Sequence, residues 1–179
     1  MRSMKTMATL TALVVAVFGG ALRPVRAALP STTLHPAADE WNPLVNGDFE
    51  NGATGWTKTK GYFAVTEYPD PSNHVGVLRG ASGYTSEITQ TMSNLTPGKY
   101  AIFVSTQGHS SCSTTVTVES GGQAPFTTTE NSNFGLMNLD FCVPAGASSA
   151  TVKISVTGTG LGRYIQIDGG FVIFMGICG

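Results

Sequence analysis

The chain has 179 residues, of which only 12% are charged, and its formal net charge is −1. This balance excludes the strongly basic surface that binding to nucleic acid or to anionic lipid requires. The 22 glycines and the many serines and threonines are unfavourable for helices and typical of strands joined by tight turns. The composition therefore predicts an all-β protein.

The first 27 residues have the features of a signal peptide. Arg2 and Lys5 precede an apolar run, and the small residues Val25 and Ala27 occupy the two positions that define a cleavage site. A retained anchor helix is the alternative, but the run is shorter than the about 20 residues that span a bilayer. We expect cleavage after Ala27, which leaves a secreted protein of 152 residues with six basic and eleven acidic side chains.

The mature chain is expected to contain an arm and a single domain. Residues 28–43 are interrupted by prolines and lack a hydrophobic period, which indicates a linker or a loosely attached arm. From residue 44 to residue 179, runs of β-branched and aromatic residues recur between turn signals, at the spacing of a two-sheet antiparallel β-sandwich. The expected strands are 44–50, 63–68, 75–79, 87–92, 99–107, 113–119, 126–130, 136–143, 150–157 and 163–175.

Three segments of the domain resemble one known family. They are Leu44-Val-Asn-Gly-Asp-Phe-Glu-Asn-Gly52 with Gly55-Trp-Thr57, then Ile88-Thr-Gln-Thr-Met92 leading to Leu95-Thr-Pro-Gly-Lys-Tyr100, and finally Tyr164-Ile-Gln-Ile-Asp-Gly-Gly-Phe-Val-Ile173. In this order they resemble the cellulose- and xylan-binding modules of the galactose-binding-like superfamily. The resemblance implies a jelly roll that binds extracellular polysaccharide or glycan without catalysis. The closing segment departs from the family, which has two consecutive acids where this chain has Asp168-Gly169.

The sequence contains no pattern that would assemble a catalytic site. Glycoside hydrolysis needs two carboxyl groups flanking a cleft, whereas the acids here are scattered over separate expected strands. No G-x-S-x-G motif occurs, and His35, His74 and His109 lack the spacing of a metal site or a triad. We therefore expect no enzymatic activity.

Sugar binding needs flat apolar faces edged by groups that hydrogen-bond hydroxyls. Tyr84 lies in an expected loop and Tyr62 follows Gly61 at the start of a strand, whereas Trp56 is expected in the core. Gln107 and His109 end a strand and could supply the hydrogen-bonding edge. A tyrosine folded back on the core is the alternative at either position. A structural or interaction protein of the cell surface, without a sugar site, is the alternative function.

Acids on the first and last expected strands form a candidate calcium site. Asp48, Glu50 and Asp168 would lie close together, because the first and last strands of a jelly roll are neighbours. The resemblance also implies a structural calcium in this region. The alternative is that Asp48 and Asp168 cap turns by accepting hydrogen bonds from backbone N–H groups.

Three cysteines lie in the mature chain, and an oxidising compartment favours one disulfide and one remaining thiol. We expect a Cys112–Cys142 bond, because both residues lie at strand ends beside loops. Cys178 is then free or available to a protein partner. The alternation of the strands opposes this pairing: Cys112 is in phase with inward-facing valines, whereas Cys142 is out of phase with its apolar neighbours.

Overall fold

The computed structural model describes residues 42–108, 111–131, 134–159 and 163–179. The chain divides into two units, Met1–Thr33 and Leu34–Gly179, and every described residue belongs to the second. The expected signal peptide and most of the expected arm lie outside the described residues. Within the described part of the chain, no helix is long and apolar enough to cross a membrane.

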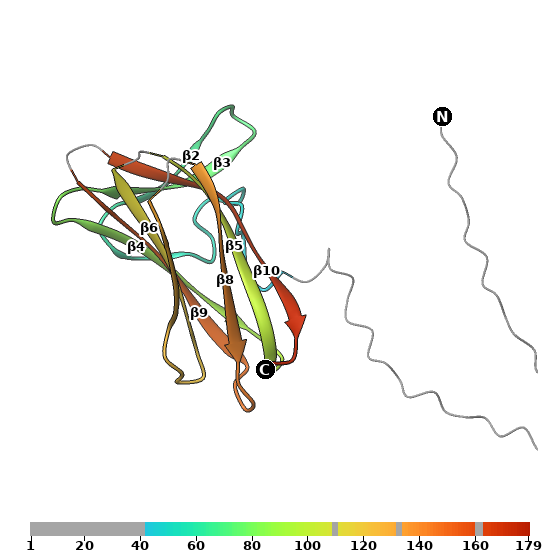
Figure 1. The fold of residues 1–179 in the computed structure, drawn as a ribbon. Coiled ribbons are helices and arrows are strands. Elements are labelled where there is room, and N and C mark those ends of the chain that lie inside the picture. The colour runs from blue at the N-terminus through green and yellow to red at the C-terminus, as the bar shows by residue number, and fades with distance from the viewer. Residues whose placement is uncertain (1–41, 109–110, 132–133, 160–162) are drawn as a thin grey trace, which may run out of the picture. The chain divides into compact units, whose positions relative to one another are not determined.

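The described residues form ten strands arranged in two antiparallel five-stranded sheets (Figure 1). Sheet A has the strand order β1-β4-β9-β6-β7, and sheet B has the order β2-β3-β10-β5-β8. The strands are β1 Thr57–Lys60, β2 Phe63–Glu67, β3 His74–Gly80, β4 Thr85–Ser93, β5 Gly98–Gly108, β6 Cys112–Ser120, β7 Phe126–Glu130, β8 Phe134–Val143, β9 Ser149–Gly158 and β10 Arg163–Gly176. The predicted all-β, two-sheet antiparallel sandwich is confirmed.

The prediction of a strand over residues 44–50 is wrong. Asn46 and Phe49 have positive φ angles of 52° and 61°, which are incompatible with a strand. The side chain of Asn46 holds this loop together: its Oδ1 accepts from the Asn51 N–H at 2.8 Å, and its Nδ2 donates to the Gly52 carbonyl at 2.8 Å. The missed strand is β1, an edge strand whose four residues are polar and exposed, so no alternation revealed it.

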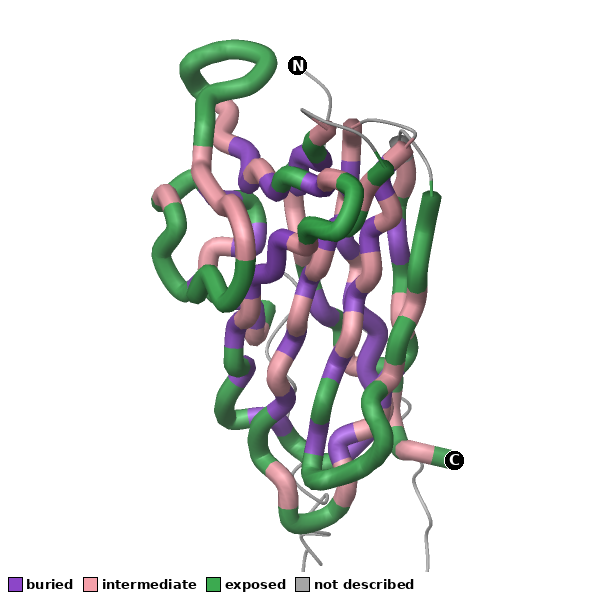
Figure 2. Tube along the Cα trace, turned by 90° about the vertical axis from the view of Figure 1, so that its left-hand side faces the viewer, coloured by how far each residue is buried: buried purple, intermediate pink, exposed green. Residues whose placement is uncertain are grey.

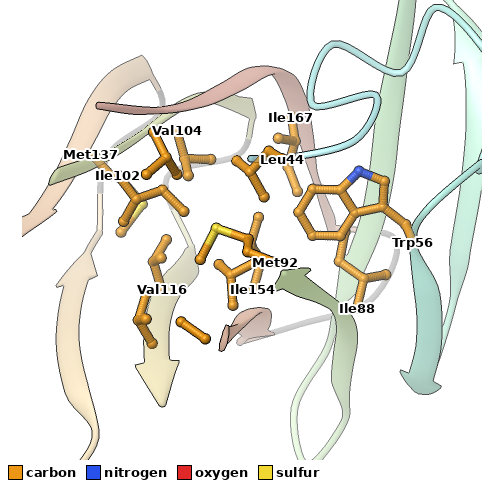
Figure 3. Packing of buried hydrophobic residues seen from close by; sticks show 14 of the residues in the cluster. Leu44, Trp56, Ile88, Met92, Ile102, Val104, Val116, Met137, Ile154 and Ile167 are labelled. Carbon is orange, nitrogen blue, oxygen red and sulfur yellow. The ribbon is translucent and has the colours of Figure 1, made fainter. Parts of the chain in front are cut away.

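The core lies between the two sheets and includes the loop that precedes β1 (Figure 3). Burial alternates along the strands, as Figure 2 shows. Trp56 is 7% exposed, stacks on Phe49 at a centroid distance of 5.6 Å, and donates its indole N–H to the Asn46 carbonyl at 3.1 Å. A β-carbon at Gly76 would come within 2.7 Å of the Phe49 ring, so glycine is required there. The prediction of Trp56 as a core residue is confirmed.

The disulfide joins Cys142 to Cys178, with the two Cα atoms 6.0 Å apart, so the predicted Cys112–Cys142 bond is wrong. Cys112 is buried on the inner face of sheet A, and burial raises the pKa of its thiol. Cys142 belongs to sheet B, where its Cα partner is Lys99, one residue out of phase with the inward Tyr100–Phe141 pair. Cys112 therefore faces the core from sheet A, whereas Cys142 lies on the outer face of sheet B, so these two side chains cannot form a disulfide. Because Cys178 is bonded within the chain, the expected partner through this residue is not supported.

The disulfide assignment predicts a specific peptide map. Non-reducing digestion should release one linked peptide that contains Cys142 and Cys178, and Cys112 should be alkylated only after unfolding. Reduction should lower the free energy of unfolding by at most about 4 kcal/mol, the chain-entropy value for a loop of this length. A linked peptide containing Cys112, or three reactive thiols in the native protein, would contradict the assignment.

The packing of Trp56 predicts a large loss of stability on truncation. Trp56→Ala removes a buried ring and its stacking contact with Phe49, so we expect the free energy of unfolding to fall by about 3 to 5 kcal/mol. Chemical denaturation of the mature protein measures this change. Trp56→Phe, which keeps a ring against Phe49, serves as the control and should cost less. An unchanged denaturation midpoint for the alanine variant would show that the ring is not part of the core.

Candidate functional site

A small cleft lies on the outer face of sheet B, towards the end where β10 begins. Its volume is about 170 Å³, and we call it the amide cleft after the two glutamines that line it. The lining residues are Tyr68, Gln107, Gly108, Tyr164 and Gln166. They come from three separate parts of the chain: the loop after β2, the end of β5 and the start of β10.

The antiparallel pairing of β5 and β10 places the two glutamines side by side. Gln107 and Gln166 are direct Cα partners, and on β10 Gln166 alternates with the core residues Ile165 and Ile167. Both amides therefore belong to the outer face. Gly108 completes the lining, and a β-carbon there would collide with the backbone carbonyl of Tyr164. The close approach of the two strands in this region thus requires glycine.

Two half-exposed tyrosines flank the amides. Tyr164 precedes Gln166 by two residues on β10, so it lies on the same face, and it is 45% exposed. Tyr68 is 40% exposed and lies in the hairpin loop between β2 and β3. A ring with this exposure offers part of its face to a ligand while its remaining surface packs on the protein.

Asn73 ties the β2–β3 hairpin loop to β10. Its carbonyl accepts from the Tyr68 N–H at 2.8 Å, and its side-chain amide donates to the Tyr68 carbonyl and, at 3.5 Å, to Oδ1 of Asp168. Within the loop, Asp70 accepts from the Ser72 hydroxyl and N–H, and these bonds lower the pKa of the Asp70 carboxyl. The loop that carries Tyr68 is therefore internally bonded and attached to the strand that carries Gln166.

Tyr62 lies outside the amide cleft but on a neighbouring part of the same face. Arg79 on β3 is the Cα partner of Tyr164, and its guanidinium carbon is 3.9 Å from the centroid of the Tyr62 ring. The Tyr62 N–H also donates to the Ser86 hydroxyl at 2.9 Å. One face of this ring is thus occupied by a cation–π contact, and only its other surface is available to a ligand.

The remaining predicted sugar-binding residues have different positions. Gln107 lines the amide cleft, as described above. Tyr84 is 43% exposed in the turn between β3 and β4, where its N–H donates to the Ala81 carbonyl at 2.9 Å, and it does not line the cleft. His109 lies outside the described residues. Sequence reasoning missed Tyr68, Tyr164 and Gln166, because it assigned all three to expected strands, 63–68 and 163–175, and not to a binding surface.

The three acids predicted to bind calcium take part in separate hydrogen-bonded contacts. Glu50 accepts from the N–H and Nδ1 of His74 at 2.8 and 3.1 Å, and these bonds lower the pKa of its carboxyl. Oδ1 of Asp48 accepts from the Glu50 N–H at 3.4 Å, and Asp168 bonds Asn73. No group of three acidic, histidine or cysteine side chains suited to a metal ion occurs among the described residues. Calcium binding there would depend on carbonyl ligands, and it stays a prediction.

A second feature of the same outer face is an apolar stripe formed by Phe103, Phe171, Ile173 and Met175. Phe103 and Phe171 are Cα partners on β5 and β10, and their rings stack at a centroid distance of 4.9 Å with an interplanar angle of 14°. The three β10 members of the stripe are exposed. The stripe and the amide cleft follow one another along the same two strands.

The outer face of sheet A differs in character, because it is covered by hydroxyl groups. Thr91 and Thr151 bond at 3.2 Å, and Thr115 and Thr129 bond at 3.0 Å across neighbouring strands. A polar hollow of about 440 Å³ lies at one end of this sheet, but its lining includes no aromatic ring. The exposed aromatic side chains that lie within described strands, Tyr164 and Phe171, are both on β10 of sheet B.

Comparison with known proteins identifies the fold. No protein-family model matches the chain, and no curated protein matches it in sequence. Among solved structures, the carbohydrate-binding module TmCBM61, determined with β-1,4-galactotriose, is 17% identical, with a TM-score of 0.63 over 75% of this chain and 99% of that one. A family 16 carbohydrate-binding module is 15% identical, with a TM-score of 0.56 over 74% of this chain and 99% of that one.

An enzyme also has the same fold. A cyclase from Fischerella sp. TAU, determined in complex with 4-(1H-indol-3-yl)butan-2-one, is 13% identical, with a TM-score of 0.59 over 77% of this chain and 98% of that one. Because identities this low establish architecture alone, the activity has to be argued from the site. The chain therefore has the β-sandwich fold of carbohydrate-binding modules.

Proposed function

We propose that this protein is a secreted, non-catalytic module that binds extracellular polysaccharide or glycan in the amide cleft. The observation that carries the proposal is the juxtaposition of Gln107 and Gln166 between two half-exposed tyrosines. Tyrosine rings offer flat surfaces to the C–H faces of a sugar ring. A carboxamide can donate and accept at once, so two adjacent amides match the vicinal hydroxyls of a pyranose.

The size of the cleft limits what it holds. Its volume of about 170 Å³ is smaller than the roughly 300 to 1,000 Å³ of pockets that enclose drug-sized ligands. We therefore infer that the cleft receives a single sugar ring, with the rest of the glycan lying outside on the face of sheet B.

The lining of the cleft favours an uncharged sugar. The lining contains no acidic or basic residue, and the nearby Arg79 is engaged with Tyr62. Binding should therefore vary little with salt between low and physiological ionic strength, because no screened charge pair contributes to it.

Two observations support binding rather than hydrolysis, and a third supports secretion. The cleft lining supplies no pair of carboxyl groups, which glycoside hydrolysis requires. Two of the solved structures that share the fold are carbohydrate-binding modules. The Cys142–Cys178 bond is typical of proteins in oxidising compartments and so supports the secretion inferred from residues 1–27.

A second candidate function is a structural or interaction role at the cell surface. The apolar stripe around Phe171 is the observation that favours it, because exposed aromatic and aliphatic side chains gathered on one face are characteristic of interaction surfaces. The two functions differ in which residues matter: the amide cleft for sugar, and the stripe for a protein.

The binding proposal is tested with the mature protein on a glycan array and in pull-down with insoluble wall polymers. For any ligand found, Tyr164→Ala and Gln166→Ala should each weaken binding by about 1 to 3 kcal/mol, which is roughly 5- to 150-fold in Kd. Thr115→Ala, on the hydroxyl-covered face of sheet A, is the matched control and should leave Kd unchanged. Circular dichroism of each variant separates lost binding from lost folding.

Tyr84→Ala and Tyr62→Ala extend the same experiment to the residues predicted from sequence. Weaker binding in either variant would show that the binding site extends to that tyrosine. Unchanged binding in both would confine the site to the amide cleft. The proposal itself is refuted if no plant, fungal or bacterial wall polymer is bound. It is refuted equally if a bound glycan is indifferent to both Tyr164→Ala and Gln166→Ala.

A further inference from the structure

Sheet B ends on one side in β8, the longest of the four strands that form the edges of the two sheets. It pairs with β5 through ten consecutive Cα partners without a register shift (Figure 1). Within the described part of the chain no other strand pairs with β8, so its second edge presents backbone N–H and C=O groups without strand partners. Such an edge is a template for pairing with a further strand.

The other three edge strands carry features that oppose such pairing. β1 has four residues, two of which are lysines, and a register shift interrupts its pairing with β4. β2 and β7 have five residues each, and each ends on a glutamate. Shortness, charge and irregularity are the usual protections of an edge strand. β8 lacks them: it has ten residues, no proline and one charged side chain, Asp140, which Lys99 neutralises at 2.7 Å.

Two leucines of β8 keep apolar surface in contact with water. Leu136 is 60% exposed on the outer face of sheet B. Leu139 points the other way and packs against the margin of the core, where it is only partly buried. A strand added to this edge would remove apolar surface of both side chains from water, which is favourable.

The β8 strand is complementary to a second copy of itself that runs in the opposite direction. When the two copies are aligned so that Leu139 lies opposite Leu139, Asn138 of each copy lies opposite Asp140 of the other. In the same alignment Leu136 lies opposite the disulfide-bonded Cys142. Apolar groups therefore meet apolar groups, and an amide donor meets a carboxylate. Matched pairs of this kind between directly opposite residues stabilise antiparallel strands.

The neighbouring alignments match less well. Centring the pair on Asn138 places Leu136 opposite the Asp140 carboxylate. Centring it on Asp140 places the two carboxylates opposite each other, and like charges in this position are destabilising. The alignment on Leu139 also keeps residues 135–143 of each strand paired, which is nearly the whole of β8.

We propose that two copies of this protein associate through β8, antiparallel and centred on Leu139, to form one continuous sheet of ten strands, five from each copy. The two-fold axis of this dimer is perpendicular to the sheet, because only that axis joins identical edges with opposite strand directions. Both outer faces of sheet B therefore point to the same side. One strand from each copy makes a small interface, so we expect a weak dimer with a Kd of about 1 to 100 μM.

In this dimer the two amide clefts lie on the same side of one sheet. If the function proposed above holds, a single polymer surface can contact both clefts at once. Linked sites bind a polyvalent ligand more tightly than separate sites do, without any new contact. The dimer should therefore bind insoluble polymer more tightly than the monomer does, whereas each cleft should bind a soluble oligosaccharide with unchanged affinity.

Sedimentation equilibrium of the mature protein, without any glycan, tests the association. Asn138→Asp places a carboxylate opposite Asp140 at two symmetric positions and should raise the Kd of the dimer by about 3- to 30-fold at low salt. Asn138→Lys places a cation there and should not raise it. Thr57→Asp, on the exposed edge strand β1 of sheet A, is the matched control for the added negative charge and should leave the Kd unchanged. Circular dichroism checks the folding of each variant.

Hydrogen exchange locates the interface in the unmodified protein. Protection of the peptide that covers residues 135–143 should increase with protein concentration, because association supplies partners for backbone groups that are open in the monomer. Peptides from the other edge strands, β1, β2 and β7, should exchange equally at all concentrations.

Three results would overturn the proposal. The first is a protein that stays monomeric up to about 1 mM. The second is a dimer that Asn138→Asp does not weaken, or that Asn138→Lys weakens as strongly. The third is concentration-dependent protection at another edge in place of β8. None of these results bears on glycan binding by the amide cleft, which is measured with soluble oligosaccharide at protein concentrations below the Kd of the dimer.

Discussion

The register between β5 and β10 sets the arrangement of polar and apolar side chains on the outer face of sheet B. It brings Gln166 opposite Gln107 at one end and Phe171 opposite Phe103 at the other. Between these pairs the register shifts at Asp168–Gly169, where Gly169 has a φ of 119° that side-chain-bearing residues rarely adopt. This irregularity separates the polar and apolar halves of the outer face. It also lies next to the point on β10 where pairing with β3 ends and the contacts of Asn42 with β10 begin.

The two sheets have different outer faces although they share one core. Sheet A exposes rows of threonine hydroxyls, which interact well with water and with each other. Sheet B exposes tyrosine, glutamine and an apolar stripe. A sandwich that presents rings and amides on one face only has one face suited to recognising a sugar, and this asymmetry supports the proposed function more strongly than the fold does.

The opening motif, which carries most of the family resemblance, has a structural role in this protein. Asn46 bonds the loop to itself, Phe49 fills the space above Gly76, and Trp56 stacks on Phe49 while its indole N–H caps the Asn46 carbonyl. Such a motif preserves the closure of the sandwich whatever the ligand. Any relation of this protein to a particular polysaccharide therefore has to be argued from other residues.

The all-β class, nine of the ten strands within a few residues and the burial of Trp56 were predictable from the amino-acid sequence. Strands were predictable because the alternation of apolar and polar residues and the turn residues between strands are local features of the sequence. The burial of Trp56 was predictable because its large ring is hydrophobic. The pairing of Cys142 with Cys178 was not predictable in this way, because it depends on the sheet and the face on which each cysteine side chain lies. Only the tertiary structure brought Tyr68 to Gln107 and Gln166, because residues distant in sequence meet through strand order and register, which local patterns do not specify.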